Sequence, residues 1–133
     1  GTITGVAKYL REQNPDIQVI GADPVGSIYS NDEVHPYLVE GVGEDFWPQT
    51  FDPSVVDRYV TVSDRDSFLT TRKLAADEGL LVGGSCGLAV HAALQVASEI
   101  DDRNAMIAVI RPGSTNSVPE ISPPRIRCSS QPI

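Results

Sequence analysis

A glycine and a threonine stand at the start of the sequence, where they could bind an anion. Apolar residues recur at the spacing of one helix face between Ile3 and Leu10, so a helix is expected directly after this pair. Backbone amides and a threonine hydroxyl at a helix N-terminus suit a phosphate or carboxylate group. The alternative is that Gly1 and Thr2 only begin the helix, and composition does not decide between the two.

A second candidate is the segment Gly-Gly-Ser-Cys-Gly at residues 83–87, which is expected to turn a buried strand into a helix. Its glycines allow a flat ligand or another backbone to approach closely. Ser85 would present its hydroxyl at the carboxyl end of the strand, where open α/β sheets place ligands. The alternative is a tight turn with Ser85 as the helix N-cap. Cys86 falls on the apolar stripe of the helix, which favours a small core residue over a reactive thiol.

The third candidate is residues 40–48, in which Gly41 and Gly43 lie beside carboxylates and precede Phe46 and Trp47. This segment could be a loop that faces a ligand, or equally a loop anchored by two buried aromatic rings. The sequence contains no pair of ligands with zinc spacing, so no metal site is expected. It also lacks the nucleophile-elbow, Walker and G-x-G-x-x-G patterns, which argues against a Rossmann-type nucleotide binder.

The elements that would position these segments alternate between helix and strand. The first helix should end at Asn14, because the residue before a proline is pushed out of the helical region. Ser63 is a suitable N-cap and Gly79 a suitable C-terminal stop for a second helix. Strands are expected at residues 17–22, 59–62, 80–82 and 105–110, with a further helix at 86–97 and a long segment without periodicity at 25–53. This order predicts an α/β fold with a mostly parallel sheet.

Composition excludes several classes of partner. The chain of 133 residues is 41% hydrophobic and 21% charged, as in ordinary soluble globular proteins. Ten Lys and Arg against 18 Asp and Glu give a net charge of −8, which argues against nucleic acid as a partner. No apolar run is long enough to span a membrane, so no membrane partner is expected. The two cysteines, Cys86 and Cys128, fit a reducing compartment, and we expect a cytoplasmic protein.

The two ends of the chain carry expectations of their own. The sequence begins with Gly1 rather than Met and shows no signal-peptide pattern, so we expect a processed product or part of a longer protein. Residues 112–133 contain five prolines and five serines among few apolar residues, and this tail is expected to be disordered. Residues 1–111 would then form the structured domain.

Four segments in order resemble the fold type II pyridoxal phosphate enzymes, and among them the cystathionine β-synthase and cysteine synthase family. Residues 1–5 (GTITG) look like the end of the family's phosphate-binding segment. Residues 20–27 (IGADPVGS) resemble the strand and turn that follow this segment. Residues 40–48 (EGVGEDFWP) resemble the glycine loop that faces the cofactor. Residues 80–87 (LLVGGSCG) resemble the segment whose serine meets the pyridine nitrogen. The resemblance covers residues 1 to about 110 and implies the C-terminal part of a three-layer, Rossmann-like, mostly parallel sheet with flanking helices.

The resemblance also implies roles for individual residues. Gly1 and Thr2 would help to hold the phosphate of pyridoxal 5'-phosphate, and Ser85 would hydrogen-bond its pyridine nitrogen. Gly41 and Gly43 would let the loop approach the cofactor and the bound amino acid. The implied reaction joins L-serine and L-homocysteine into cystathionine by β-elimination and replacement, in a homo-oligomer that takes small amino-acid substrates. The alternative within the class is cysteine synthase, which uses O-acetylserine and sulfide.

Two departures from the family limit these expectations. The Schiff-base lysine of the family lies upstream of the matched segments, and Lys8 and Lys73 fall outside any matching motif. We therefore expect no catalytic residue in this chain and no activity from it alone, and a non-catalytic remnant or scaffold is the alternative from another class. The resemblance also stops at Arg111, where Pro112-Gly113 replaces the family's Leu-Pro-Asp continuation, which suggests a shifted reading frame.

Overall fold

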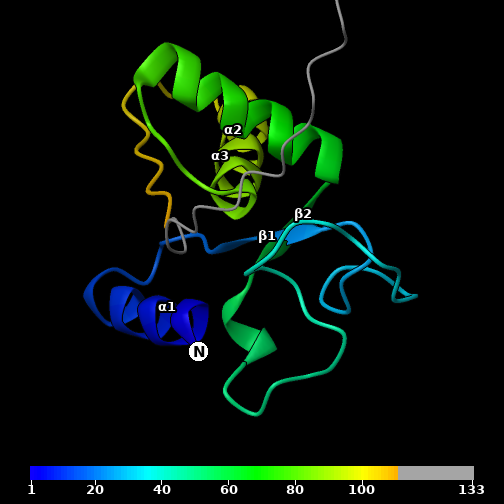
Figure 1. Ribbon diagram of the computed structural model, residues 1–133. Coiled ribbons are helices and arrows are strands. Elements are labelled where there is room, and N and C mark those ends of the chain that lie inside the picture. Colours follow the sequence, from blue (N-terminus) through cyan, green and yellow to red (C-terminus); the bar gives the residue numbers. More distant parts are fainter. Residues whose placement is uncertain (111–133) are drawn as a thin grey trace, which may run out of the picture.

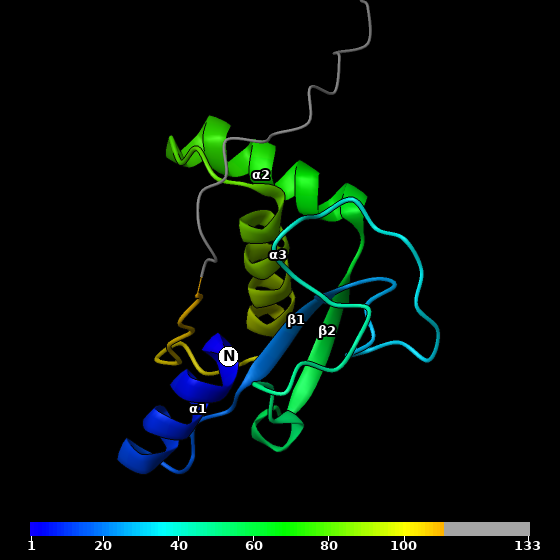
Figure 2. The same cartoon turned by 60° about the horizontal axis from the view of Figure 1, so that its bottom comes forward.

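The computed structural model describes residues 1–110, in which helices alternate with two short strands (Figures 1 and 2). The elements in chain order are α1 (Thr2–Gln13), β1 (Ile20–Pro24), the 3-10 helix η1 (Pro53–Val55), β2 (Arg58–Val62), α2 (Asp64–Glu78) and α3 (Gly84–Ser98). The expected tail at residues 112–133, together with Cys128, lies outside the described residues.

The two strands form a parallel pair, with Ile20 opposite Arg58 and Pro24 opposite Val62. α3 contacts both strands, and α2 packs on α3. In the view of Figure 1, α2 and α3 lie above the strands and α1 lies below them. The expected mixture of helices and parallel strands is therefore confirmed.

β1 begins three residues later than the sequence pattern predicted. The pairing of β1 with β2 begins at Ile20, and different hydrogen bonds hold the backbone just before it. The Val19 amide donates to the Asp57 carboxylate at 2.6 Å, and the Asp57 amide donates to the Val19 carbonyl at 2.9 Å. The Asp57 side chain therefore satisfies the Val19 amide, and the Asp57 backbone satisfies the Val19 carbonyl, in place of the strand ladder that we expected.

The predicted helix ends are confirmed. Asn14, directly before the proline, has an extended backbone (φ −148°, ψ 106°) and is the C-cap of α1. The Ser63 hydroxyl accepts from the Asp66 amide at 3.1 Å at the start of α2. Gly79 ends that helix in the left-handed conformation at φ +67°, which glycine adopts without strain.

The strands expected at residues 80–82 and 105–110 are wrong. Both segments are irregular, with Leu81 85% and Met106 93% exposed. A strand is stable only where a neighbouring strand satisfies its amides and carbonyls, and within residues 1–110 the sheet consists of β1 and β2 alone. Val82 is the one member of the first segment that is buried.

The core lies between the strands and α3. It consists of Val39, Val62, Leu88 and Ala92, which are at most 3% exposed. Gly87 allows α3 to approach α2 closely, because a Cβ at this position would lie 2.1 Å from the Ser67 carbonyl oxygen. The position of α3, and of the residues at its start, therefore depends on a glycine at the helix contact.

Candidate functional site

Ser85 lies in the first turn of α3 with its side chain buried. The N-cap is Gly83, whose carbonyl accepts from the amides of Cys86 at 3.1 Å and Gly87 at 3.3 Å. The alternative in which Ser85 caps the helix is therefore wrong. Ser85 is only 5% exposed, and none of the described residues hydrogen-bonds its hydroxyl. Within residues 1–110 the only enclosed side-chain oxygen or nitrogen without a partner is the Tyr59 hydroxyl, so the Ser85 oxygen is accessible and can bond a ligand or water.

The hydroxyl of Ser85 lies beside the glycine loop, which we define as residues 40–48. A Cβ built on Gly41 would lie 4.0 Å from the Ser85 Oγ, and no other atom would lie within 4 Å of it. Gly41 has φ +79°, a conformation that side chains rarely adopt. The structure thus brings two of the predicted site residues together, with the Ser85 hydroxyl beside the position that a side chain at residue 41 would occupy.

Gly43 lies in a more crowded environment than Gly41. A Cβ at Gly43 would meet Pro24 Cγ at 2.6 Å and the Tyr37 hydroxyl at 2.7 Å. Its φ of +72° also lies in the left-handed region. Gly43 therefore lets the loop pack against the end of β1, whereas Gly41 faces the space next to Ser85.

The segment that contains the glycine loop is held at both ends by side chains that sequence reasoning missed. The Asp64 carboxylate accepts from the amides of Leu38 at 2.9 Å and Val39 at 3.1 Å. The Ser27 hydroxyl accepts from the Glu44 amide at 3.1 Å, and the Glu44 carbonyl accepts from the Ile28 amide at 2.9 Å. Asp64 is in the first turn of α2.

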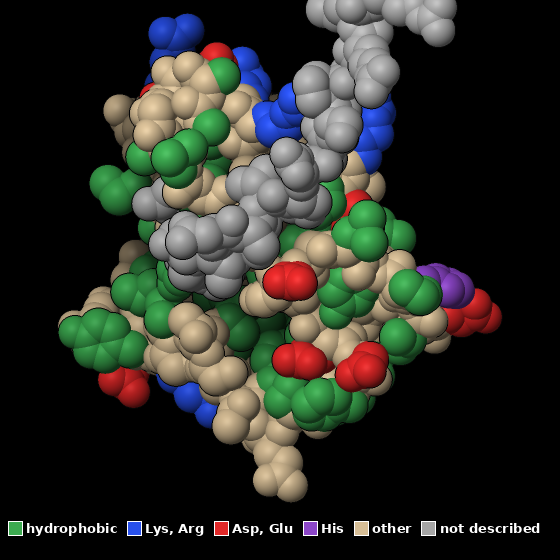
Figure 3. All heavy atoms as spheres, viewed as in Figure 1, with side chains coloured by type: hydrophobic (Ala, Val, Ile, Leu, Met, Phe, Trp, Pro, Cys, Tyr) green, Lys and Arg blue, Asp and Glu red, His purple; other side chains and the backbone are tan. Residues whose placement is uncertain are grey.

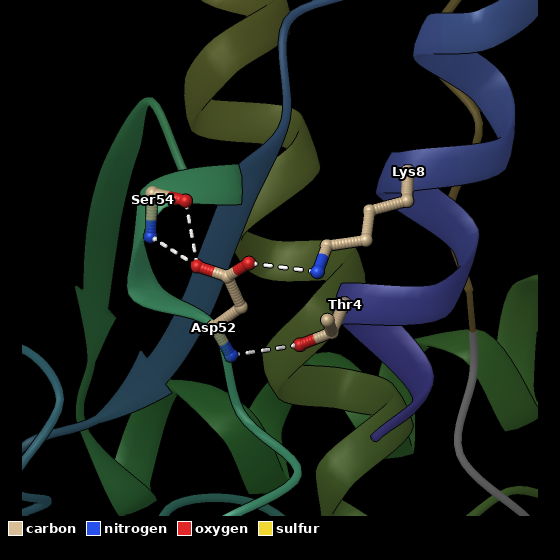
Figure 4. A network of polar contacts seen from close by, with 4 residues as sticks. All are labelled: Thr4, Lys8, Asp52 and Ser54. Atoms are coloured by element: carbon tan, nitrogen blue, oxygen red, sulfur yellow. Dashed lines mark hydrogen bonds and ion pairs between the residues drawn. The ribbon is translucent and has the colours of Figure 1, made fainter.

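Gly1 lies at the start of α1, as predicted, beside the far end of the same long segment. A Cβ on Gly1 would lie 3.9 Å from the Thr50 hydroxyl. Figure 4 shows the contacts that follow along α1: the Thr4 hydroxyl accepts from the Asp52 amide at 3.0 Å, and Lys8 pairs with the Asp52 carboxylate at 2.8 Å.

Among the described residues no hydrogen bond joins Gly1 or Thr2 to Ser85 or the glycine loop. The link between these two parts of the predicted site is the segment from residue 38 to residue 52, which contacts Ser85 near one end and α1 at the other.

The aromatic residues of the glycine loop are exposed. Phe46 is 58% and Trp47 51% exposed, so the alternative of a loop anchored by two buried rings is wrong. Trp47 instead packs edge-on against Tyr29, with ring centroids 5.4 Å apart, and stacks on Phe51 at 5.8 Å. On the face seen in Figure 3, acidic and apolar side chains gather over the segment between β1 and β2, whereas Lys and Arg gather mainly over α2.

Two kinds of titratable group lie near the end of β1. Burial raises the pKa of Asp23 above its ordinary value, while hydrogen bonds from Ser30 and Ser27 oppose this shift. Burial, with the negative charges of Glu44 and Asp23, raises the pKa of Tyr29 to about 12. Tyr29 therefore stays neutral at physiological pH and cannot act as a base there.

Both lysines lie on the surface in ion pairs. Lys8 is paired with Asp52, and its side chain is 57% exposed. Lys73 is paired with Asp77 one helical turn away, and its side chain is 77% exposed. Each is already occupied by a carboxylate on an exposed surface, unlike the desolvated lysines that form Schiff bases.

The described residues offer little to other classes of site. In residues 1–110 no group of three or more His, Cys, Asp or Glu side chains is arranged to hold a metal ion. Both histidines have protein neighbours: His91 contacts the Thr70 hydroxyl at 3.2 Å, and His35 lies 3.6 Å from Glu33. No helix in this part of the chain is both long and apolar enough to cross a membrane.

The family model of pyridoxal-phosphate dependent enzymes matches residues 1–112, which include every segment described above. The chain belongs to this family. The cofactor of the family is pyridoxal phosphate, as the sequence resemblance implied.

Two curated relatives are similar to most of the chain. A cystathionine beta-synthase from Apis mellifera is 40% identical over 121 residues, which are 87% of this chain and 24% of the relative. A cysteine synthase from Helicobacter pylori (strain J99) is 42% identical over 109 residues, which are 82% of this chain and 36% of the relative. The chain thus spans about a quarter to a third of the relatives that it matches.

A solved structure, that of an O-acetylserine dependent cystathionine beta-synthase from Helicobacter pylori, superposes with a TM-score of 0.70 at 44% identity. The match covers 74% of this chain and 32% of that structure. This similarity confirms a fold type II architecture, of which the chain forms a part.

The residues of the site fit a flat aromatic cofactor. Ser85 is 5% exposed, its hydroxyl has no hydrogen-bond partner within residues 1–110, and a Cβ on Gly41 would lie 4.0 Å from its oxygen. A hydroxyl can both donate and accept, so it can pair with a ring nitrogen in either protonation state. Gly41 leaves room for a ring that a side chain would fill.

Proposed function

We propose that the protein is a cystathionine β-synthase, which forms cystathionine from L-serine and L-homocysteine, and that residues 1–110 supply one part of its cofactor site. The observation that carries the proposal is the Ser85 hydroxyl, which has no hydrogen-bond partner among the described residues and lies beside Gly41. The relatives of both kinds, cystathionine beta-synthase and cysteine synthase, support the reaction class of replacement at the β-carbon of an amino acid.

When bound, pyridoxal phosphate supplies the electron sink that makes elimination and replacement at the β-carbon possible. Ser85 would donate to or accept from the pyridine nitrogen. Unlike an aspartate, its hydroxyl does not hold that nitrogen protonated, and this limits the electron-withdrawing power of the ring. Such moderation suits β-replacement better than reactions that need a long-lived carbanion.

The other residues of the chain would bind and orient. Gly1 and Thr2 would hold the phosphate with backbone amides and a hydroxyl at the N-terminus of α1, where the helix dipole favours an anion. Gly41 would let the loop backbone lie against the cofactor and the substrate, and Gly43 would fix the loop against β1. We further propose that the Schiff-base lysine is supplied from outside this chain, that the protein works as a cytoplasmic homo-oligomer, and that the chain alone is inactive.

Cysteine synthase is the second candidate, because a relative of that name is 42% identical and the solved structure that matches is named as O-acetylserine dependent. Turnover assays on the complete enzyme separate the two. L-serine with L-homocysteine should give cystathionine, and O-acetylserine with sulfide should give little cysteine. Faster cysteine formation would support the second candidate, and protein without the visible absorbance of bound pyridoxal phosphate would support a non-catalytic remnant.

The role of Ser85 is tested by Ser85→Ala in the complete enzyme. We expect kcat/KM to fall at least tenfold and the absorbance of the bound cofactor to shift. The unfolding free energy should change little, because the hydroxyl bonds to none of the described residues. Ser98→Ala is the matched control, since Ser98 is at the exposed end of the same helix and bonds only to Gln95 among the described residues. A Ser85→Ala enzyme with normal activity and an unchanged cofactor spectrum contradicts the contact with the ring.

A further inference from the structure

Asp23 is a buried carboxylate at the carboxyl end of β1, and its side-chain partner is a hydroxyl rather than a cation. It is 2% exposed and accepts from the Ser30 hydroxyl at 2.5 Å. Among the described residues no Lys, Arg or His is paired with it. Burying a carboxylate without a paired cation lowers the stability of the fold, so Asp23 is a candidate for a role in the site.

Ser27 is in the turn that the hydrogen bond between Ser30 and Asp23 closes, and it connects this turn to the glycine loop. It is completely buried, and its hydroxyl accepts from the Glu44 amide at 3.1 Å. The hydroxyl also accepts from the Tyr29 amide at 3.4 Å, so it holds a backbone amide of its own turn and one of the loop. By fixing this turn, Asp23 fixes the position of the Ser27 hydroxyl.

The loop between residues 38 and 44 has no ladder or helix to fix it. Its amides are held at residues 38 and 39 by the Asp64 carboxylate, and at residue 44 by Ser27. Gly41 lies between these two attachments, beside Ser85. If either attachment is lost, the backbone at Gly41 becomes more mobile beside the Ser85 hydroxyl, because glycine restricts the backbone least.

We propose that Asp23 and Ser27 are positioning residues that hold the glycine loop against Ser85, acting through the Ser27 hydroxyl on the backbone amide of Glu44. The inference rests on the proposed function in one respect, that the loop borders the cofactor. The two residues do not touch the reacting atoms. They fix the distance between the Gly41 backbone and the Ser85 hydroxyl, and so pre-form the space that the cofactor ring enters.

The first test measures the loop itself, with amide hydrogen exchange of the intact protein before cofactor is added. Ser27→Ala should raise exchange in peptides covering residues 40–48 by about five- to tenfold, the effect of one buried hydrogen bond. Ser67→Ala is the matched control, because Ser67 is equally buried and its hydroxyl bonds to the Ser63 carbonyl inside α2. The control should leave the exchange of residues 40–48 unchanged.

The second test measures cofactor binding. Since only the ordered loop is competent to bind, Ser27→Ala should raise the Kd for pyridoxal phosphate by the factor by which it lowers the ordered fraction of the loop, whereas Ser67→Ala should not. Unchanged loop exchange in Ser27→Ala overturns the proposal. An unchanged Kd in a variant whose loop is mostly disordered also overturns the positioning role. The contact of Ser85 with the cofactor is tested separately with Ser85→Ala.

Ser27→Ala could destabilise the whole domain, which would appear as faster exchange in α2 and α3 as well. Asp23→Asn then decides, since it keeps the shape of the side chain and removes one acceptor oxygen. Faster exchange confined to residues 40–48 supports the proposal. Unchanged exchange there contradicts it.

Discussion

Replacing Gly87 by alanine should displace α3 from α2 and, with it, the serine at the start of α3. The added Cβ would lie 2.1 Å from the Ser67 carbonyl oxygen and 2.8 Å from the Thr71 amide nitrogen. Both are backbone atoms of α2, so rotation of a side chain cannot relieve the overlap. Ordinary contact requires the helices to separate by about 1 Å or more.

Such overpacking typically costs about 1–3 kcal/mol. It outweighs the roughly 1 kcal/mol by which alanine favours a helix over glycine. Because Ser85 is two residues from Gly87, the displacement should also reach the site. A misplacement of about 1 Å at a reacting group can lower catalysis on the order of 100-fold.

Urea unfolding followed by circular dichroism measures the first effect, and kcat/KM of the complete enzyme the second. Gly5→Ala is the matched control, because Gly5 is in α1 and a Cβ there would have no neighbour within 4 Å. The control should stabilise the protein slightly, and it serves for stability alone because Gly5 is in the segment that resembles the phosphate-binding segment. If Gly87→Ala is as stable as the parent protein and equally active, the close contact between α2 and α3 does not position Ser85.

Two further predictions concern the core and the surface. Leu88→Ala should lower the unfolding free energy by about 2–5 kcal/mol, measured by urea titration, because Leu88 is completely buried; a loss below 1 kcal/mol would mean that the core rearranges around the gap. Asp52→Asn should make the unfolding free energy depend less on acid pH. Hydrogen bonds from Lys8 and Ser54 lower the pKa of Asp52 to about 2. The pairing therefore stabilises the protein fully above pH 3.8, the ordinary pKa of the group, and this stabilisation is lost as the pH falls toward 2. Urea midpoints of the variant and the parent should therefore converge toward pH 2, and a constant difference between them would contradict the pairing.

Local sequence signals predicted the elements that depend on local physics. Ser63 and Gly79 bound α2 because an N-cap hydroxyl and a left-handed glycine act on the turn in which they occur. The strands expected at residues 80–82 and 105–110 were wrong for the opposite reason, since a strand depends on a partner that its own residues do not specify. Apolar, β-branched composition alone could not show whether such a partner lies beside them.

The site shows the same division. From its residues alone the sequence determined that Gly41, Gly43 and Ser85 are unusual, and by resemblance it assigned them to one cofactor. Only the tertiary structure separated Gly41, which lies beside the Ser85 hydroxyl, from Gly43, which packs tightly against Pro24 and Tyr37. The tertiary structure was also needed to show that Asp64 and Ser27 hold the loop. These hydrogen bonds join residues that are 17 to 26 positions apart, and such bonds produce no periodic pattern in the sequence. The spacing of residues in the sequence indicates the conformation of one helix or strand, whereas tertiary packing decides which elements contact one another.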